Sequence, residues 1–137
     1  SLAILRGASD LGSPPPKLLA VTVLTSWSEE SFIKELGINQ PLIERVEMLA
    51  ELAADCCIEG CICSPLEVQS LRTLFPHPFE LITPGVRAHF DSSEDQARVM
   101  SPSEAIQSGA SKIVVGRPIT KAKDPLSAFS KYCEELG

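Results

Sequence analysis

Two arginines of the chain occupy positions from which a guanidinium group could bind an anion. Arg87 follows the turn at Pro84 and Gly85 after an apolar strand, and Arg117 directly follows Gly116 after another apolar run. A guanidinium presents a planar fork of donors that pairs bidentately with phosphate oxygens, and a glycine lets the backbone approach the bound group closely. A single arginine is usually a solvated surface residue, but this repeated placement after a strand and a glycine turn favours an anion site.

A long polar connection carries the first of these arginines. Residues 82–100 read ITPGVRAHFDSSEDQARVM, which is the end of a strand, a sharp turn and a polar stretch before a helix start at Ser101. Connections of more than about 12 to 15 residues without structure of their own are usually lids, binding loops or disordered segments. The connection contains Gln96, and also Asp95 and Arg98, which we interpret as residues that brace the loop. Such a loop has little apolar surface to bury, so a closed form would depend on ligand contacts.

The composition is that of an ordinary globular domain. The chain has 137 residues, of which 44% are hydrophobic and 22% charged, enough for one domain with one core. A net charge of −6 argues against a general nucleic-acid-binding protein, which would show a basic surface, but leaves room for a local basic pocket. No apolar run approaches the roughly 18 to 20 residues that cross a bilayer, and residues 1–12 have no signal-peptide pattern. We predict a cytoplasmic protein that binds neither membranes nor nucleic acid.

The cysteines and histidines do not indicate a metal site. Zinc ligands usually come as two separated pairs, each with a spacing of two to four residues, whereas Cys61 and Cys63 alternate within an apolar run. His77 and His89 have no second ligand nearby in the sequence. Free thiols in a reducing compartment behave as small, buried hydrophobic groups. We therefore predict no metal and interpret the clustered cysteines as buried thiols: Cys56, Cys57, Cys61 and Cys63.

Apolar patterns of two periods alternate along the chain. The run 18–24 is predicted to be a strand buried on both faces of a parallel sheet, and residues 42–53 carry the apolar stripe of a helix. Helix ends are marked by Gly109 and by Asp124 followed by Pro125. The further predicted strands are 60–64, 80–83 and 112–116, and the further helices are 65–74, 102–108 and 124–136. Each predicted strand thus leads into a helix.

This alternation of strands and helices is compatible with two architectures, an open doubly wound sheet and a closed eight-unit barrel. The dinucleotide-binding open sheet expects Gly-x-Gly-x-x-Gly after its first strand, and residues 25–27 supply nothing like it. Barrels place their chemistry at the carboxyl ends of the strands, often with a phosphate site on the loops after strands seven and eight. The predicted strand ends are polar: Thr25 and Ser26, Ser64, Thr83 to Gly85, and Gly116 with Arg117. Residues 1–8 read as a helix already under way, so we expect the chain to be cut. If it is the second half of a barrel, the loops after strands seven and eight are 82–100 and the one at Gly116 and Arg117.

Five segments, taken together, resemble the orotidine 5′-monophosphate decarboxylase family. They are LLAVTVLTS (18–26), CSPLE (63–67), ITPGVR (82–87), DQARVMSPSEAI (95–106) and IVVGRPIT (113–120), the last followed by DP at 124–125. They occur in the order and spacing of the family, and their combination is highly specific although each alone would be weak. The resemblance implies an α/β fold, a (β/α)8 TIM barrel. Residues 1–137 would then be a single segment that supplies the last four βα units, strands five to eight.

The resemblance also implies a phosphate site. Gly116 and Arg117 resemble the phosphate-binding pair after strand eight, and Arg87 and Gln96 resemble residues of the loop after strand seven. Gln96 is similar to the family residue that folds over the ligand and touches phosphate and base. In this interpretation, 82–100 is a lid that senses the phosphate dianion and is ordered when a nucleotide is bound.

Two further residues would contact the pyrimidine. Thr25 resembles the residue at the end of strand five that hydrogen-bonds the ring, and Pro84 resembles a residue that lines the base pocket. Thr25 could instead cap the following helix, but Ser28 can also do so. We interpret Trp27 as a residue that packs the loop and not as a platform for a base.

The catalytic residues of the family have no counterpart in this sequence. The family uses an alternating Lys/Asp array from strands one to three, with one Asp from a neighbouring subunit and the signature Asp-x-Lys-x-x-Asp followed by Ile-Pro-Asn-Thr; the chain contains no such run. The resemblance therefore implies a homodimeric decarboxylase that converts orotidine 5′-monophosphate (OMP) to UMP and CO2 without a cofactor, with no catalytic residue in this chain, which alone would be inactive. Two alternatives remain open: a noncatalytic half-barrel that binds a nucleotide or phosphate, and a related sugar-phosphate barrel enzyme.

Overall fold

A parallel sheet forms the centre of the computed structural model, which describes residues 16–88 and 100–137. Its strands are β1 (Ala20–Val21), β2 (Gly60–Ile62), β3 (Glu80–Pro84) and β4 (Lys112–Val114), hydrogen-bonded in the order β1, β2, β3, β4. All three neighbouring pairs are parallel. The carboxyl ends of all four strands therefore lie at the same edge, as predicted. The predicted helix at residues 1–8 lies outside the described residues.

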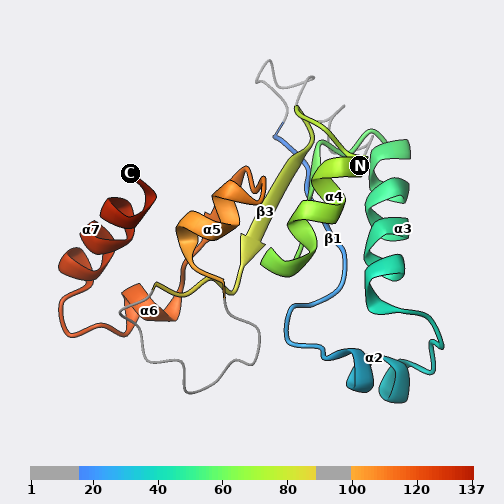
Figure 1. Ribbon diagram of the computed structural model, residues 1–137, viewed down its shortest axis with the longest axis horizontal. Helices are drawn as coiled ribbons and strands as arrows, with labels where there is room; N and C mark the ends of the chain where they lie inside the picture. The colour runs from blue at the N-terminus through green and yellow to red at the C-terminus, as the bar shows by residue number, and fades with distance from the viewer. Residues whose placement is uncertain (1–15, 89–99) are drawn as a thin grey trace.

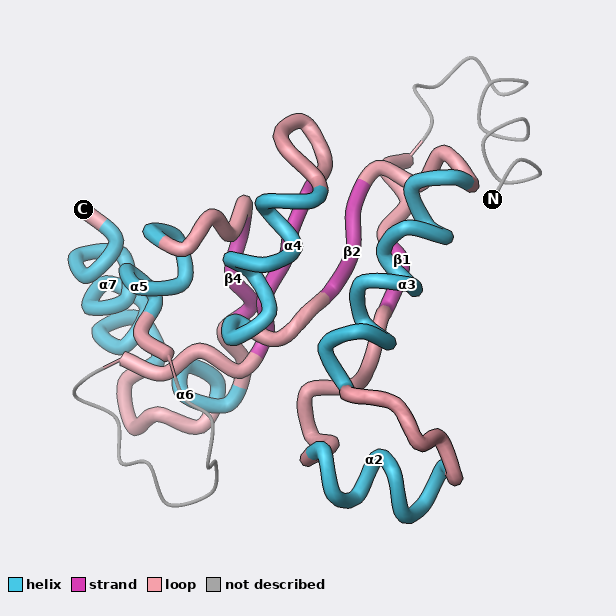
Figure 2. Tube along the Cα trace, turned by 45° about the vertical axis from the view of Figure 1, so that its right-hand side comes forward, coloured by secondary structure: helices cyan, strands magenta, loops and turns pink. Residues whose placement is uncertain are grey.

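Helices cover one face of this sheet. Those described are α2 (Glu29–Leu36), α3 (Leu42–Asp55), α4 (Val68–Leu74) with a preceding 3-10 turn η1 (Pro65–Glu67), α5 (Pro102–Gln107), α6 (Arg117–Thr120) and α7 (Pro125–Leu136). In Figures 1 and 2, α3, α4, α5 and α7 follow one another across the molecule, with α3 and α7 at opposite ends. In Figure 1, the short helix α6 lies near the lower end of β3, to which its arrow points, and α2 lies at the bottom of the picture below α3.

Local sequence sets the helix ends. The Ser28 side chain accepts a hydrogen bond from the backbone N–H of Ser31 and caps α2, and Asp124 Oδ1 accepts one from Ser127 N at 3.1 Å and caps α7. After α5 the chain turns at Gly109, whose φ of +109° lies in the left-handed region. The predicted caps at Asp124 and Ser28 are confirmed.

The core lies between the sheet and the helices. The side chains of Cys61 and Leu81 point to the helices and are fully buried, as are Val46 of α3 and Leu71 of α4. Side chains alternate between the two faces of a strand, so their neighbours Val21, Ile62 and Ile82, which share one register row, point to the opposite face. In a closed barrel that face would be the interior.

The prediction for residues 18–24 was wrong in length and burial. Only Ala20–Val21 are paired as a strand, and Val21 and Leu24 are each 59% exposed. The reason is the position of β1, which forms one edge of the sheet, while β4 forms the other. An apolar run typical of a fully buried strand therefore lies at an edge that pairs with no further strand among residues 16–88 and 100–137.

We expect the purified chain to associate in solution through these two edges. Unpaired strands with apolar side chains are templates for pairing with another chain, and Val21 on β1 and Val114 on β4 are 59% and 47% exposed. Light scattering would measure the mass of the wild type and of the double variant Val21→Lys, Val114→Lys, which should associate less. The control is Leu74→Lys at an exposed position of α4, which lies between α3 and α5 and away from both edge strands, and it should leave the mass unchanged. A stable wild-type monomer at micromolar concentration would contradict this expectation.

The amino-terminal edge of the sheet is held by an ion cluster around Glu80. Glu80 Oε1 lies 3.1 Å from Lys112 Nζ and 3.3 Å from Lys17 Nζ. Glu80 pairs in register with Gly60, where an added Cβ would lie 2.3 Å from the Glu80 carbonyl oxygen, so only glycine fits there. The hydrogen bond from Lys112 is the main reason that the pKa of Glu80 lies below its ordinary value, and the one from Lys17 adds to it.

This cluster should make part of the stability depend on acid pH. Because the pKa of Glu80 is lower in the folded chain, its ionised form stabilises the fold above the unfolded pKa, and this contribution is lost as pH falls through the folded pKa. Denaturant unfolding of wild type and Glu80→Gln should show a difference in unfolding free energy at neutral pH that shrinks below about pH 4. Glu35→Gln is the control, because it removes one carboxylate at an exposed position of α2, outside this cluster. If the unfolding free energies of wild type and Glu80→Gln differ by the same amount from neutral to acid pH, this prediction is wrong.

Candidate functional site

The pairing of β3 with β4 places the two candidate arginines on adjacent loops. Pro84, the last residue of β3, is in register with Val114, the last residue of β4. Arg87 comes three residues after Pro84, and Arg117 comes three residues after Val114. Both loops leave the carboxyl edge of the sheet, the edge at which a barrel places its chemistry. Pro84 and the two arginines thus lie at the same edge of the sheet, on neighbouring strands or the loops that follow them.

Three hydrogen bonds hold the chain around Arg87. Its backbone N–H donates to the Met100 carbonyl at 3.1 Å, and its Nη1 donates to the Val86 carbonyl at 2.9 Å. The next backbone N–H, that of Ala88, donates to the Tyr132 hydroxyl of α7 at 3.2 Å. Sequence reasoning did not find Tyr132, because nothing in the local sequence of α7 indicates which backbone group its hydroxyl contacts. The Arg87 side chain is half-buried between two buried neighbours on an anchored backbone.

Gly116 and Arg117 form the start of α6. The Gly116 carbonyl accepts hydrogen bonds from the backbone N–H groups of Ile119 and Thr120, each at 3.0 Å, and the Arg117 side chain is exposed. A Cβ added at Gly116 would meet no atom within 4 Å. Packing against residues 16–88 and 100–137 therefore does not require glycine there, and close approach of a ligand is one reason for it.

Thr25 lies at the same edge but on the far side of β2. It is an exposed residue in the turn after β1, closed by a hydrogen bond from Trp27 N to the Leu24 carbonyl at 3.1 Å. Ser28, not Thr25, caps the following helix. Trp27 packs edge-on against Phe32, with ring centroids 6.5 Å apart, which confirms its interpretation as a residue that packs the loop.

The remaining candidate of the long connection lies outside the described residues. Gln96, together with Asp95, Arg98 and His89, falls in the segment 89–99. The interpretation of 82–100 as a lid therefore concerns mainly residues that the structure does not describe. Its two ends are described, and they meet at the hydrogen bond between Arg87 and Met100.

Two serines at the starts of helical turns have structural roles. The Ser64 N–H donates to Glu67 Oε2 at 2.8 Å, and the Ser101 N–H donates to Glu104 Oε2 at 2.9 Å. In both cases the serine side chain caps the turn in return, which is a capping box with proline at the first helical position. The motifs SPLE and SPSE are thus explained by helix initiation, and the polar strand end at Ser64 is a cap.

The interpretation of the cysteines as buried thiols holds for only part of the cluster. Cys61 and Cys63 are fully buried, whereas Cys56 and Cys57 at the end of α3 are exposed. The hydrogen bond between the two buried thiols lowers the pKa of Cys61 and raises that of Cys63, and burial adds to the second effect. Among residues 16–88 and 100–137, no group of three or more His, Cys, Asp or Glu side chains could hold a metal ion.

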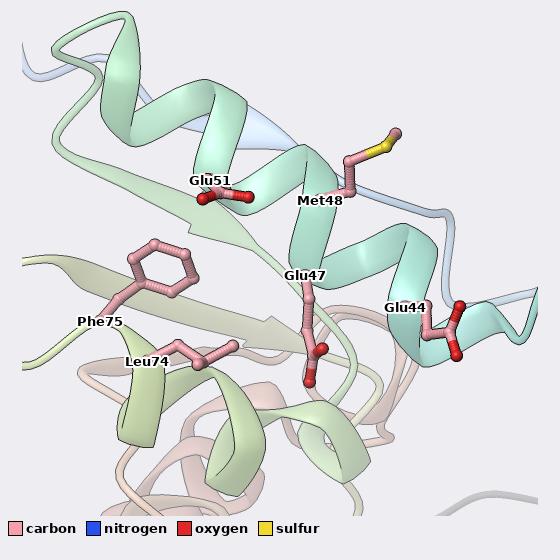
Figure 3. A pocket seen from close by; sticks show the side chains of 6 residues that line it. All are labelled: Glu44, Glu47, Met48, Glu51, Leu74 and Phe75. Atoms are coloured by element: carbon pink, nitrogen blue, oxygen red, sulfur yellow. The ribbon is translucent and has the colours of Figure 1, made fainter.

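A groove on the helical surface is acidic, unlike the carboxyl edge of the sheet, which carries the two arginines. It has a volume of about 350 Å³ between α3 and the end of α4, and Figure 3 shows its lining: Glu44, Glu47, Met48, Glu51, Leu74 and Phe75. The Ser70 hydroxyl of α4 donates to Glu47. Three carboxylates would repel a phosphate, so this groove is not a candidate for the anion site.

None of the helices in the described part of the chain is long and apolar enough to span a membrane.

Comparison with known proteins identifies the fold and its relatives. The family described as "Orotidine 5'-phosphate decarboxylase / HUMPS family" matches residues 2–132. Proteins named orotidine 5'-phosphate decarboxylase from Prochlorococcus marinus and from Synechococcus sp. (strain WH7803) are 54% and 55% identical, over 96% and 98% of this chain. The crystal structure of orotidine 5'-phosphate decarboxylase from Lactobacillus acidophilus is 40% identical, with a TM-score of 0.75 over 92% of this chain.

The matches cover only part of each relative. They span 55% of both curated proteins and 51% of the Lactobacillus chain. The chain therefore spans about half the length of the curated relatives that it matches. The predicted class of fold is confirmed: the parallel βα arrangement is that of half a TIM barrel.

Proposed function

We propose, because the chain belongs to the orotidine 5'-phosphate decarboxylase / HUMPS family, that it supplies the phosphate- and pyrimidine-binding half of an orotidine 5'-phosphate decarboxylase. The whole enzyme would convert OMP to UMP and CO2 in pyrimidine biosynthesis. The observation that carries the proposal is the placement of Arg87 and Arg117 on adjacent loops at the carboxyl edge of β3 and β4. In this proposal β1 to β4 are strands five to eight of the barrel.

The six residues of the site would divide between two ends of the nucleotide. Arg117, the Gly116 backbone, Arg87 and Gln96 would bind the phosphate, through charge-assisted hydrogen bonds from the guanidinium groups. At the other end, the pyrimidine would be contacted by two residues: Thr25 and Pro84. No group of this chain would take part in bond breaking.

The chemical step would belong to the part of the barrel outside this chain. Departure of CO2 leaves negative charge on a pyrimidine carbon, which a lysine ammonium of the Lys/Asp array would stabilise and then protonate, so no metal or organic cofactor is needed. The phosphate is remote from that carbon, but its binding energy can lower the barrier when it is realised in the transition state. We propose that the enzyme is a homodimer and acts in the cytoplasm.

The first test asks whether this chain supplies half of an active site. Residues 1–137 would be assayed for OMP turnover alone and together with a separately expressed chain, which carries the part of the Prochlorococcus marinus relative that this chain does not match. We call the combination the two-chain assembly. The chain alone should be inactive because it has no Lys/Asp array, and the assembly should turn OMP over.

Each contrary result has a distinct meaning. Turnover by residues 1–137 alone would overturn the assignment of catalysis to the missing strands. An assembly that binds UMP but does not turn over OMP would favour the alternative of a noncatalytic nucleotide-binding half-barrel. An assembly that acts on a sugar phosphate and not on OMP would favour the other alternative, a sugar-phosphate barrel enzyme.

The second test concerns Arg117. In the two-chain assembly, Arg117→Ala should reduce kcat/KM for OMP, because a charge-assisted contact to phosphate is lost. The reduction should correspond to a loss of about 2 to 4 kcal/mol in transition-state stabilisation. A truncated substrate without phosphate should be affected little. The control is Lys123→Ala, which removes an exposed positive charge between α6 and α7 and should change neither rate. An equal loss on both substrates would instead assign Arg117 a structural role.

A further inference from the structure

The tyrosine of α7 links that helix to the loop that carries Arg87. Tyr132 is 3% exposed, and its hydroxyl accepts the hydrogen bond from Ala88 N at 3.2 Å. Tyr132 is the only tyrosine of the sequence. The group that it contacts is a backbone N–H one residue after Arg87, and Ala88 itself is 3% exposed.

The rest of α7 is largely exposed, so this contact is the main point at which the helix enters the core. Tyr132 is the buried residue of α7, whereas Leu126 and Phe129 of the same helix are 76% and 53% exposed. For packing alone, an apolar side chain at position 132 would serve equally well. A tyrosine at a buried position normally has a polar partner for its hydroxyl, and here one such partner is the Ala88 backbone N–H, beside a proposed ligand-binding residue.

Helix α7 also packs against α6, the helix that begins with Arg117. Figures 1 and 2 both show α6 close to the start of α7. One helix therefore contacts the element that carries Arg117 and, through Tyr132, the backbone that carries Arg87. The bond from Arg87 N to the Met100 carbonyl holds this backbone at one point. A second bond at the next residue, Ala88, restricts the rotation that a single bond would allow.

We propose that Tyr132 is a positioning residue of the phosphate site, whose hydroxyl fixes the backbone at Arg87 and Ala88 relative to α6 and thereby sets how the Arg87 and Arg117 guanidinium groups meet one phosphate. The inference rests on the proposed function. Phenylalanine at this position would keep the ring and its packing but would leave the buried Ala88 N–H without this partner. Its effect should therefore appear in phosphate binding more than in the chemical step.

The test uses Tyr132→Phe in the two-chain assembly. KM for OMP should rise about threefold to tenfold, the factor that corresponds to one lost net hydrogen bond, with a smaller change in kcat. The same variant should leave the rate with a substrate that lacks phosphate unchanged. Ser130→Ala removes a hydroxyl from an exposed position of the same helix and is the matched control, expected to match the wild type on both substrates.

A second measurement needs no substitution of Tyr132. Because the chain has one tyrosine, growth with 3-fluorotyrosine labels Tyr132 alone when the partner chain is expressed separately. Addition of UMP should shift its fluorine resonance, since the hydroxyl would sense the backbone at Arg87 when the phosphate binds. Uridine, which lacks the phosphate, should cause a much smaller shift. This measurement decides the question even if Tyr132→Phe does not fold.

The outcomes separate the inference from the proposed function. An unmodified assembly that neither binds UMP nor turns over OMP would contradict the proposed function and this inference with it. Turnover that Tyr132→Phe leaves unchanged would overturn the inference alone. So would an equal loss on both substrates, which indicates a merely structural role, or a fluorine resonance that UMP at saturation does not move.

Discussion

The parallel pairing of β3 with β4 is the constraint on which the proposed site depends. Backbone hydrogen bonds align Ile82 with Lys112 and Pro84 with Val114, so both strands end at the same level. Each loop that follows then starts from a fixed position, and an arginine lies three residues beyond the strand end in both. A shift of the pairing by two residues would displace one loop by about 7 Å relative to the other, more than a guanidinium group could compensate for while still sharing one phosphate.

Side-chain contacts at the amino-terminal edge of the sheet hold β3 and β4 in this register. The Arg72 guanidinium of α4 donates to the carbonyls of Gly109 and Phe79, at 2.9 and 2.8 Å, and to Ser111 Oγ at 2.9 Å. It thereby ties together the chain segments that enter β3 and β4. A Cβ at Gly109 would lie 2.9 Å from Arg72 Cγ, so glycine leaves room for this side chain. With the ion cluster of Glu80, the amino-terminal edge stabilises the sheet and the carboxyl edge carries the proposed site, the usual division in barrels.

The half-barrel carries the proposed phosphate site, but it exposes apolar surface that a closed barrel would bury. The loop after β3 is held by contacts within this chain, since Arg87 N bonds to the Met100 carbonyl and Ala88 N to the Tyr132 hydroxyl of α7. The open face, by contrast, leaves apolar side chains such as Val21 and Val114 partly exposed, and burial of such side chains is a main source of stability. The chain matches about half of each relative, and the strands of the other half would cover this face.

The sequence by itself determined the class of fold, the order of the strands and the longer helices but not α6, most helix ends and the family. Those features depend on local patterns: apolar periodicity for the elements, and Ser28, Ser101 and Asp124 for helix starts. Tertiary structure alone decided which apolar residues are buried, because β1 lies at an edge, and which cysteines are exposed. It also decided the contact between Tyr132 and Ala88, residues 44 positions apart. The physical reason is that strand neighbours and hydroxyl partners come from distant parts of the chain, whereas periodicity and capping act within a few residues.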